Sequence, residues 1–189
     1  MTDHDANVQD LGRYRLPPNF RGRSAFQVQL WWIVQSLLFH TSPQFMYGWR
    51  RWLLKLFGAK IGNGVIIRPS VRVTYPWRLE IGDRAWIGDF VELYTLDKIT
   101  IGDDAVVSQF TKLVTGTHDY EKPTFDMSTK PIVVEKQAWV SANCFVAPGV
   151  TVKRGAVVLA CSLVTKDVPE LMVVAGQPAV VKRHRLAKA

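Results

Sequence analysis

Aliphatic residues return at every sixth position through most of the chain that follows Lys60. These positions are Ile61, Ile67, Val73, Ile81, Ile87, Leu93, Ile101, Val107 and Leu113, and later Val140, Val146, Val152, Val158 and Val164. A period of six matches neither the turn of about 3.6 residues of an α-helix nor the alternation of a hairpin sheet. It predicts an all-β solenoid, in which three hexads form one triangular coil and stacked coils bury the aliphatic side chains in a continuous core.

Short polar motifs mark the expected corners of the coils. Ile-Gly-Asn at Ile61 and Ile-Gly-Asp at Ile81 and Ile101 repeat at a spacing of twenty residues. Gly tolerates positive φ, and Asn or Asp bonds to nearby backbone, so each motif is typical of a corner. The spacing exceeds three hexads by two residues, which predicts a two-residue bulge at one corner of each early coil.

Residues 25–57, before the repeat, are rich in Trp, Leu and Phe at helical spacing, with a break at Thr41-Ser42-Pro43. We expect two helices. Neither apolar run reaches the roughly 18 residues needed to span a bilayer. The helices are expected to cap the solenoid, and contact with a membrane surface is a second, compatible interpretation. The residues assigned to that contact are Trp31, Trp32, Trp49, Arg50, Arg51 and Lys55.

The expected organisation is therefore a tail and amphipathic helical segment over residues 1–59, a β-helix over residues 60–183 and a basic tail over residues 184–189. The β-helix carries an insertion at residues 117–131, inside the stretch LVTGTHDYEKPTFDMSTKPI, where the hexads break off. This stretch also holds His118, the only histidine of the repeat region. A repeat that gives up core packing at one place is typical of a functional site.

The 189-residue chain has a formal net charge of +8, concentrated at its two ends. Such ends suit cofactor phosphates or an anionic membrane as well as nucleic acid. Nucleic-acid binding is not expected, because no helix-turn-helix, RRM or zinc-finger pattern is present. Cys144 and Cys161 have neither disulfide-scaffold nor metal-ligand spacing, and no signal-peptide pattern opens the chain. These features indicate a reducing, cytoplasmic setting, with work near a membrane as the refinement that the helical segment suggests.

Six motifs in order resemble those of the hexapeptide-repeat acyltransferases, in particular the colanic-acid and exopolysaccharide branch and the related maltose and galactoside O-acetyltransferases. The resemblance covers roughly Lys60 to Arg183 and rests on THDY (117–120), KPI (130–132), AW (138–139), APGVTV (147–152), SLVTKDVP (162–169) and VAGQPAVVKR (174–183). It implies a left-handed parallel β-helix, a homotrimer, and acetyl transfer from acetyl-CoA to a hydroxyl of a sugar or exopolysaccharide precursor. It also implies that the loop Tyr120–Lys130 folds over the neighbouring subunit.

The resemblance assigns roles to individual residues. His118 is the expected general base, a role that suits a side chain ionising near neutral pH. Asp119, or another carboxylate, is the candidate to fix the imidazole tautomer. Acceptor contacts are expected from Tyr120 and from Thr95, where colanic-acid relatives often carry Asn. Coenzyme A is expected between adjacent subunits, on the positions that match the family's cofactor contacts: Trp139, Ala142, Ala160, Thr165, Lys166 and Arg183, with Lys182 as an additional cation for the phosphates.

Three departures from the family pattern, Cys161, Gln177 and Val180, lie among the C-terminal motifs. Other activities remain as alternatives. Nucleotide-sugar and amino-sugar N-acetyltransferases share the coil and the cofactor, and a non-catalytic scaffold would keep the solenoid alone. Serine acetyltransferases usually bring a long helical N-terminal domain, which is not found here. A zinc site like that of the γ-type carbonic anhydrases needs three histidines, so we expect no metal.

Overall fold

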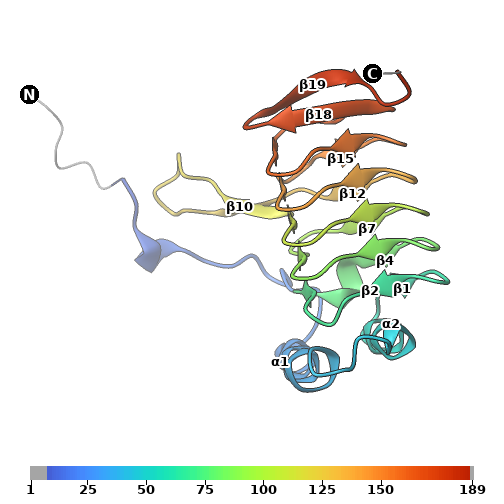
Figure 1. Ribbon diagram of the computed structural model, residues 1–189. Coiled ribbons are helices and arrows are strands. Elements are labelled where there is room, and N and C mark those ends of the chain that lie inside the picture. Colours follow the sequence, from blue (N-terminus) through green and yellow to red (C-terminus); the bar gives the residue numbers. More distant parts are fainter. Residues whose placement is uncertain (1–7, 188–189) are drawn as a thin grey trace, which may run out of the picture.

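The computed structural model describes residues 8–187 and contains three β-sheets that form the walls of a solenoid, with parallel pairing throughout except between the last two strands (Figure 1). We call them sheets A, B and C in the order in which the chain enters them. Sheet A contains β1 (Lys60–Ile61), β4 (Leu79–Ile81), β7 (Ile99–Ile101), β12 (Ile132–Val134) and β15 (Thr151–Val152). Sheet B contains β2 (Ile66–Ile67), β5 (Trp86–Ile87), β8 (Val106–Val107), β13 (Trp139–Val140), β16 (Val157–Val158), β18 (Met172–Gly176) and β19 (Ala179–His184). Sheet C contains β3 (Arg72–Val73), β6 (Glu92–Tyr94), β9 (Lys112–Val114), β14 (Phe145–Val146) and β17 (Leu163–Val164).

The predicted hexads are confirmed by the core. Each aliphatic residue at a sixth position is buried, from Ile61 at 6% exposure to Val164 at 1%. In most hexads the residue four places later is small or β-branched and is buried as well, as at Val65, Ala85 and Ala105. Each strand pairs with the equivalent strand of the next coil, so that equivalent residues are partners, as Ile61 is with Ile81 and Ile81 with Ile101. The core is therefore a continuous column, and each coil hydrogen-bonds to the coils above and below it.

The Gly-Asp corners work differently from our expectation. Positive φ falls one residue after the aspartate, at Arg84 (57°) and Asp104 (56°). Gly82 serves close approach instead, because a Cβ there would lie 2.7 Å from the Asp103 amide nitrogen of the next coil. The Asp103 carboxylate accepts a hydrogen bond from the Asp83 N–H at 2.7 Å, so it joins coils and does not bond to its own turn.

The corner between sheets C and A holds the predicted two-residue bulges. In the first coil it is occupied by η3, a 3₁₀ turn over Pro76–Arg78, and in the second by residues 95–98. The Thr95 hydroxyl joins the two, accepting from the Tyr75 N–H at 2.7 Å and donating to the Tyr75 carbonyl at 3.0 Å. In the third coil the same corner opens into the long insertion.

Helices close one end of the solenoid, and the antiparallel pair β18–β19 closes the other (Figure 1). The predicted helices are confirmed as α1 (Ala25–Val34), continued by a π-helical turn η2 (Gln35–Phe39), and α2 (Tyr47–Leu56), separated at the expected break. A short 3₁₀ turn, η1 (Leu11–Arg13), precedes them. No helix between residues 8 and 187 combines the length and the apolar character needed to cross a membrane.

Three residues assigned to membrane contact bind the solenoid instead, which corrects that part of the prediction. Trp31 is fully buried and donates to the Val73 carbonyl at 2.8 Å. Arg50 is also fully buried, and its guanidinium donates to the Ile67 carbonyl at 2.7 Å and to the Ser42 hydroxyl at 2.8 Å. Arg51 donates to the Val65 carbonyl at 2.7 Å. These side chains satisfy carbonyls of the first coil, which has no coil below it.

Candidate active site

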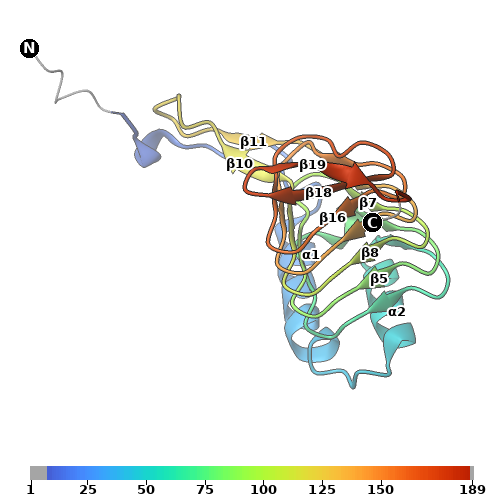
Figure 2. The ribbon, with the colours of Figure 1, turned by 45° about the horizontal axis from the view of Figure 1, so that its top comes forward.

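The insertion is a β-hairpin that projects from the corner between sheets C and A (Figure 2). Its strands are β10 (Gly116–His118) and β11 (Met127–Thr129), which pair antiparallel with His118 opposite Met127. The sequence predicted a loop inserted at residues 117–131, and in the structure this insertion carries two paired strands that begin at Gly116. A Cβ on Gly116 would lie 2.7 Å from the Leu96 side chain, so this glycine lets the hairpin leave the wall closely packed on the coil below.

His118 is held at the end of β10 by Phe125. The two rings stack at a centroid distance of 4.1 Å and an angle of 7°, and the His118 Nδ1 lies 2.8 Å from the Phe125 carbonyl oxygen. A carbonyl oxygen can only accept, so Nδ1 carries the hydrogen of the neutral imidazole. The lone pair is then on Nε2, which is the nitrogen able to take a proton from a substrate.

The backbone of the hairpin tip produces this contact. Phe125 has a positive φ of 52°, which a bulky residue adopts only when its surroundings enforce it. Asp119 does not hold the imidazole. Its carboxylate accepts from the Glu121 N–H at 3.1 Å and pairs with Lys122 at 3.4 Å. The positioning role that we considered for Asp119 is thus filled by the Phe125 carbonyl.

An N-terminal segment that carries no sequence motif runs along the hairpin. Residues 10–23, which we call the strap, lie beside β10 in both views (Figures 1 and 2). The Asp10 N–H donates to the Pro123 carbonyl at 2.8 Å, and the Tyr14 ring lies 5.8 Å from the His118 ring. His118 therefore has an aromatic neighbour in the hairpin and a second one in the strap. The strap has no periodicity, so only its contacts reveal it.

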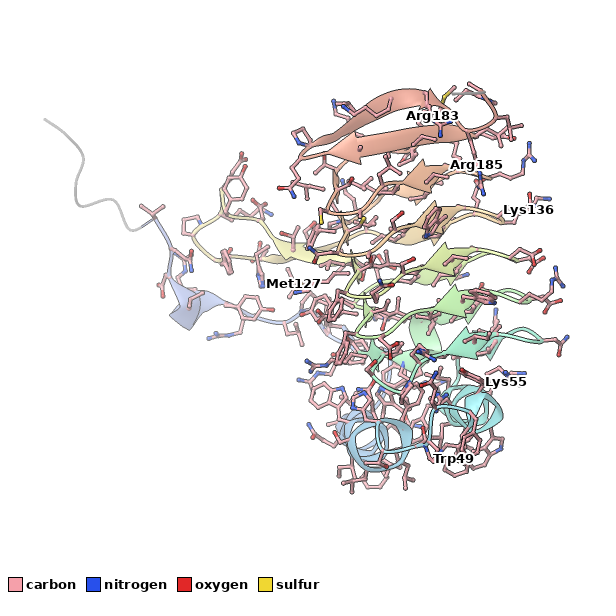
Figure 3. All side chains as sticks on the ribbon, in the orientation of Figure 1. Trp49, Lys55, Met127, Lys136, Arg183 and Arg185 are labelled. Carbon is pink, nitrogen blue, oxygen red and sulfur yellow. The ribbon has the colours of Figure 1, made fainter. Side chains whose placement is uncertain are left out.

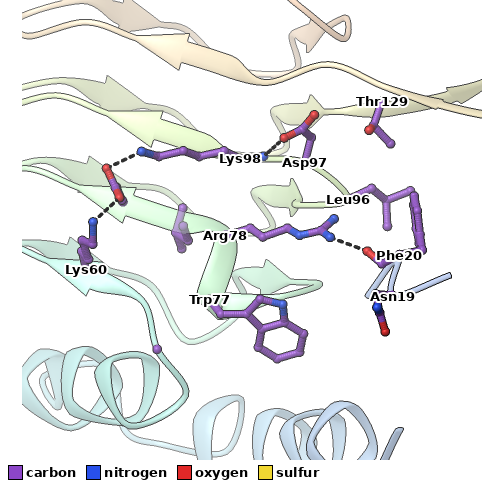
Figure 4. A pocket seen from close by; sticks show the side chains of 12 residues that line it. Asn19, Phe20, Lys60, Trp77, Arg78, Leu96, Asp97, Lys98 and Thr129 are labelled. Atoms are coloured by element: carbon purple, nitrogen blue, oxygen red, sulfur yellow. Dashed lines mark hydrogen bonds and ion pairs between the residues drawn. The ribbon is translucent and has the colours of Figure 1, made fainter. Parts of the chain in front are cut away.

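The other end of the strap is anchored on the bulge corner. Trp77 donates to the Arg21 carbonyl at 2.8 Å, and the Arg78 guanidinium donates to the Phe20 carbonyl (Figure 4). A pocket of about 400 Å³ lies here. Two acidic residues, Glu80 and Asp97, line it. Glu80 is paired with Lys60 and Lys98 at 2.7 Å each, and hydrogen bonds from these two lysines lower the pKa of Glu80. The charge of Glu80 is thus neutralised by two lysines of the same pocket.

The strap contact gives a first prediction. Tyr14→Ala is expected to lower kcat for the acetyl transfer that the resemblance implies about two- to tenfold, since one aromatic contact contributes about 0.5–1.5 kcal/mol to the position of the imidazole. KM for acetyl-CoA should not change. Tyr14→Phe keeps the ring and should keep the rate, and Leu16→Ala, at an exposed strap residue, is the matched control. Equal losses for Tyr14→Phe and Tyr14→Ala would contradict a role of the ring.

Several residues matched to cofactor contacts lie on sheet B and on the corner between sheets B and C. Trp139, on β13, is 42% exposed and donates to the Ser108 hydroxyl at 2.9 Å. Ala142 and Ala160 occupy the corner in successive coils, where the Cys161 N–H donates to the Ala142 carbonyl at 3.0 Å. On the coils below Trp139 lies a hollow of about 670 Å³, lined by Trp86, Phe90 and Phe110. The rings of Phe90 and Phe110 stack at a centroid distance of 5.1 Å.

The remaining predicted cofactor residues are exposed and lie elsewhere on the coil. Thr165 and Lys166 follow β17, on the corner from which the hairpin projects two coils earlier. Lys182 and Arg183 lie on β19, and Arg183 stands at the opposite end of the solenoid from Trp49 of the helical cap (Figure 3). Cys161 and Gln177, two of the departures from the family pattern, are in contact, because the Gln177 side chain donates to the Cys161 carbonyl at 2.8 Å.

One chain does not bring these groups together. The His118 hairpin projects from the corner between sheets C and A, whereas Trp139, Ala142 and Ala160 lie on sheet B and its corner with sheet C. Of the expected acceptor contacts, Tyr120 is 78% exposed at the hairpin tip. Thr95 is fully buried with its hydroxyl bonded to Tyr75, so the structure contradicts a direct contact with an acceptor there. No group of three His, Cys, Asp or Glu residues within 8–187 could hold a metal ion.

Comparison with known proteins identifies relatives that cover most of the chain, although no family model matches the sequence. The chain is 52% identical over 179 residues to a protein of Escherichia coli (strain K12) named as a colanic acid biosynthesis acetyltransferase, WcaF, covering 95% of this chain and 98% of that protein. It is 33% identical over 142 residues to the galactoside O-acetyltransferase of the same organism, covering 71% and 68%. A hexapeptide-repeat acetyltransferase of Vibrio cholerae, solved in complex with acetyl coenzyme A, superposes with a TM-score of 0.79 at 26% identity, covering 88% and 92%.

Proposed function

The chain belongs to the hexapeptide-repeat acetyltransferases, on the colanic-acid branch, and uses acetyl-CoA; from this premise we propose that it acetylates a hydroxyl of a saccharide, with His118 as general base. The observation that carries the proposal is the bond from the His118 Nδ1–H to the Phe125 carbonyl, which leaves the Nε2 lone pair free. The named activity of the galactoside O-acetyltransferase relative supports a sugar hydroxyl as acceptor.

The reaction follows from this tautomer. Nε2 takes the proton of the acceptor hydroxyl as its oxygen attacks the thioester carbonyl carbon. The tetrahedral intermediate then collapses, the carbon–sulfur bond breaks, and the imidazolium returns the proton to the leaving sulfur. The products are the acetyl ester and free coenzyme A, and the imidazole is again neutral. The Phe125 carbonyl keeps the same nitrogen protonated throughout, because the Nδ1–H has this oxygen as its acceptor.

We place the complete site between two copies of the chain. The hairpin of one copy reaches sheet B of the next, where Trp139, Ala142 and Ala160 would bind the cofactor and where the apolar hollow lies below them. Thr165 and Lys166 would approach from the side of the hairpin, and Lys182 and Arg183 would meet the phosphates from β19. Three copies related by a closed rotation give a homotrimer with three such sites.

The test of the function is an acceptor panel. Purified protein and acetyl-CoA are incubated with monosaccharides, oligosaccharides and amino-sugar nucleotides, and free thiol release is followed. We expect release with hydroxyl acceptors and the product as an ester, which mild alkali cleaves. Release only with amino sugars, giving an alkali-stable amide, would replace O-acetylation by N-acetylation. Binding of acetyl-CoA with no transfer to any acceptor of the panel would count against the saccharide proposal.

The outer face of the helical cap supports work at a membrane surface, through apolar residues that the sequence analysis did not assign to it and through Lys55, which it did. On α1 and η2, Phe26, Leu30, Ile33 and Leu37 are exposed at helical spacing, and Trp52 and Leu56 are exposed on α2. Lys55 lies on α2 beside them (Figure 3). We expect co-sedimentation with vesicles containing phosphatidylglycerol at moderate salt, and a clear loss for Ile33→Ser/Leu37→Ser. Equal sedimentation of this variant and the parent protein would contradict the assignment.

A further inference from the structure

A long groove runs down sheet C, between the sheet and the helical cap. Its volume is about 1050 Å³, the largest of the hollows described here. The floor is formed by Arg72 on β3 and by Glu92 and Tyr94 on β6, and the wall on the cap side by Trp32, Ser36 and His40. Because its lining residues come from two successive coils and from the cap, the groove has room for more than one sugar ring.

The upper end of this groove meets the catalytic hairpin. Leu96, which lines it, lies against Gly116, the first residue of β10, and belongs to the same apolar cluster as Met127. Met127 is the residue paired with His118 across the hairpin. A saccharide that presents one ring to His118 can therefore continue into the groove with its other rings.

The chemistry of the groove suits sugars. Arg72, Glu92 and Lys112 stand opposite one another on adjacent strands, whereas the equivalent column of sheet B is apolar, with Trp86, Val106 and Trp139. The Arg72 guanidinium makes no hydrogen bond and no ion pair with any residue of 8–187, although Arg72 lines this groove. The Tyr94 hydroxyl is protonated at neutral pH, as in any tyrosine, and can donate; burial raises its pKa further. Trp32 and Tyr94 add aromatic surface for the apolar faces of sugar rings.

We propose that this groove binds further rings of the acceptor, so that the acceptor is an oligosaccharide with Arg72 as its main polar contact. The inference rests on the proposed function and names its substrate class. A monosaccharide would fill only the end at His118 and would forgo the hydrogen bonds to Arg72 and Glu92. Since a hydrogen bond to a charged group contributes about 1.5–3 kcal/mol, Arg72 should change the affinity for a long acceptor roughly tenfold or more.

The experiment compares acceptors by length. De-O-acetylated oligosaccharides of one to six rings, prepared from colanic acid, are tested beside methyl β-galactoside at fixed acetyl-CoA. We expect kcat/KM to rise at least tenfold with length, and Arg72→Ala to remove most of this rise by increasing KM for the long acceptors. Arg72→Lys should recover part of it. Arg84→Ala, at an exposed arginine on the corner between sheets A and B, is the matched control. Saturation-transfer NMR with the hexasaccharide reports binding without catalysis.

The outcomes separate the two proposals. Equal use of short and long acceptors, with transfer still abolished by His118→Ala, would overturn the groove and leave the acetyltransferase proposal standing. A smaller assembly for Arg72→Ala by light scattering would also overturn it, because sheet C would then be an interface between copies of the chain. If no saccharide of any length is bound or acetylated, both proposals fail together.

Discussion

His118→Ala is expected to lower the rate of acetyl transfer about 10²- to 10⁴-fold, the range that a positioned general base contributes. The acceptor hydroxyl is not ionised at neutral pH, so a base must remove its proton as the oxygen attacks. The lone pair on Nε2 of His118 is the one that the hairpin offers for this step. The affinity for acetyl-CoA should stay within a factor of two, because the residues assigned to the cofactor lie on other elements. Thiol release measures the first quantity and isothermal titration the second.

Thr117→Ala is the matched control for this loss. Thr117 is the exposed residue before His118 on β10, so its substitution tests whether a change in the strand itself reduces the rate. His118→Gln keeps a polar side chain of similar reach but has no basic ring nitrogen to accept the proton, and it should be as impaired as the alanine variant. A His118→Ala protein that transfers acetyl groups at the parent rate would place the base elsewhere.

The solenoid could be predicted from the sequence because its code is local. Each hexad places one aliphatic residue in the core, and Ile67, Ile87 and Val107 are buried one above another for the same reason. A period of six admits few other structures, so the coil, its bulged corner and the place of the insertion all followed. The role of glycine in the Gly-Asp corners was harder to predict. Gly82 is required by its close approach to the next coil, and a contact between coils leaves no signal in the local sequence.

The helical cap shows where periodicity stops being informative. In α1 and η2 the buried stripe is Val28, Trp31 and Phe39, and the exposed stripe on the other side is Phe26, Ile33 and Leu37. Both stripes are apolar and both have helical spacing, so the sequence offered no basis for choosing the face that packs. Arg50 was similarly misassigned, because a cation that satisfies carbonyls of the first coil looks like a surface cation in sequence.

Only part of the candidate site could be predicted from the sequence. The histidine could be found because it interrupts the repeat, whereas its partner Phe125 depends on the register of a hairpin and on a positive φ. Tyr14 lies more than one hundred positions from His118 in the sequence, and nothing in the strap marks the contact. Residues that meet only in the folded chain, or only between chains, cannot be paired from one sequence without an alignment.

The separation of the base from the cofactor face makes a prediction about mixed assemblies. His118→Ala and Ala160→Trp should each be inactive, the first without a base and the second with a bulky ring on the exposed corner assigned to the cofactor. Co-expressed in equal amounts, they are expected to recover about a quarter of the parent activity. Each site takes its hairpin from one chain and its sheet B from the next, and random association gives both intact halves in about one site in four.

Co-expression of the parent chain with the double variant His118→Ala/Ala160→Trp is a second test of whether each site is shared between two chains, and it measures a loss of activity instead of a recovery. If each site uses two chains, it works only where both neighbours are parent chains, which leaves about a quarter of the activity. If each site lies within one chain, about half remains, and the mixture of the two single variants shows no recovery at all. Those two results together would refute the shared site and leave His118 to be joined to its cofactor within one chain, across the corner where Thr165 and Lys166 lie.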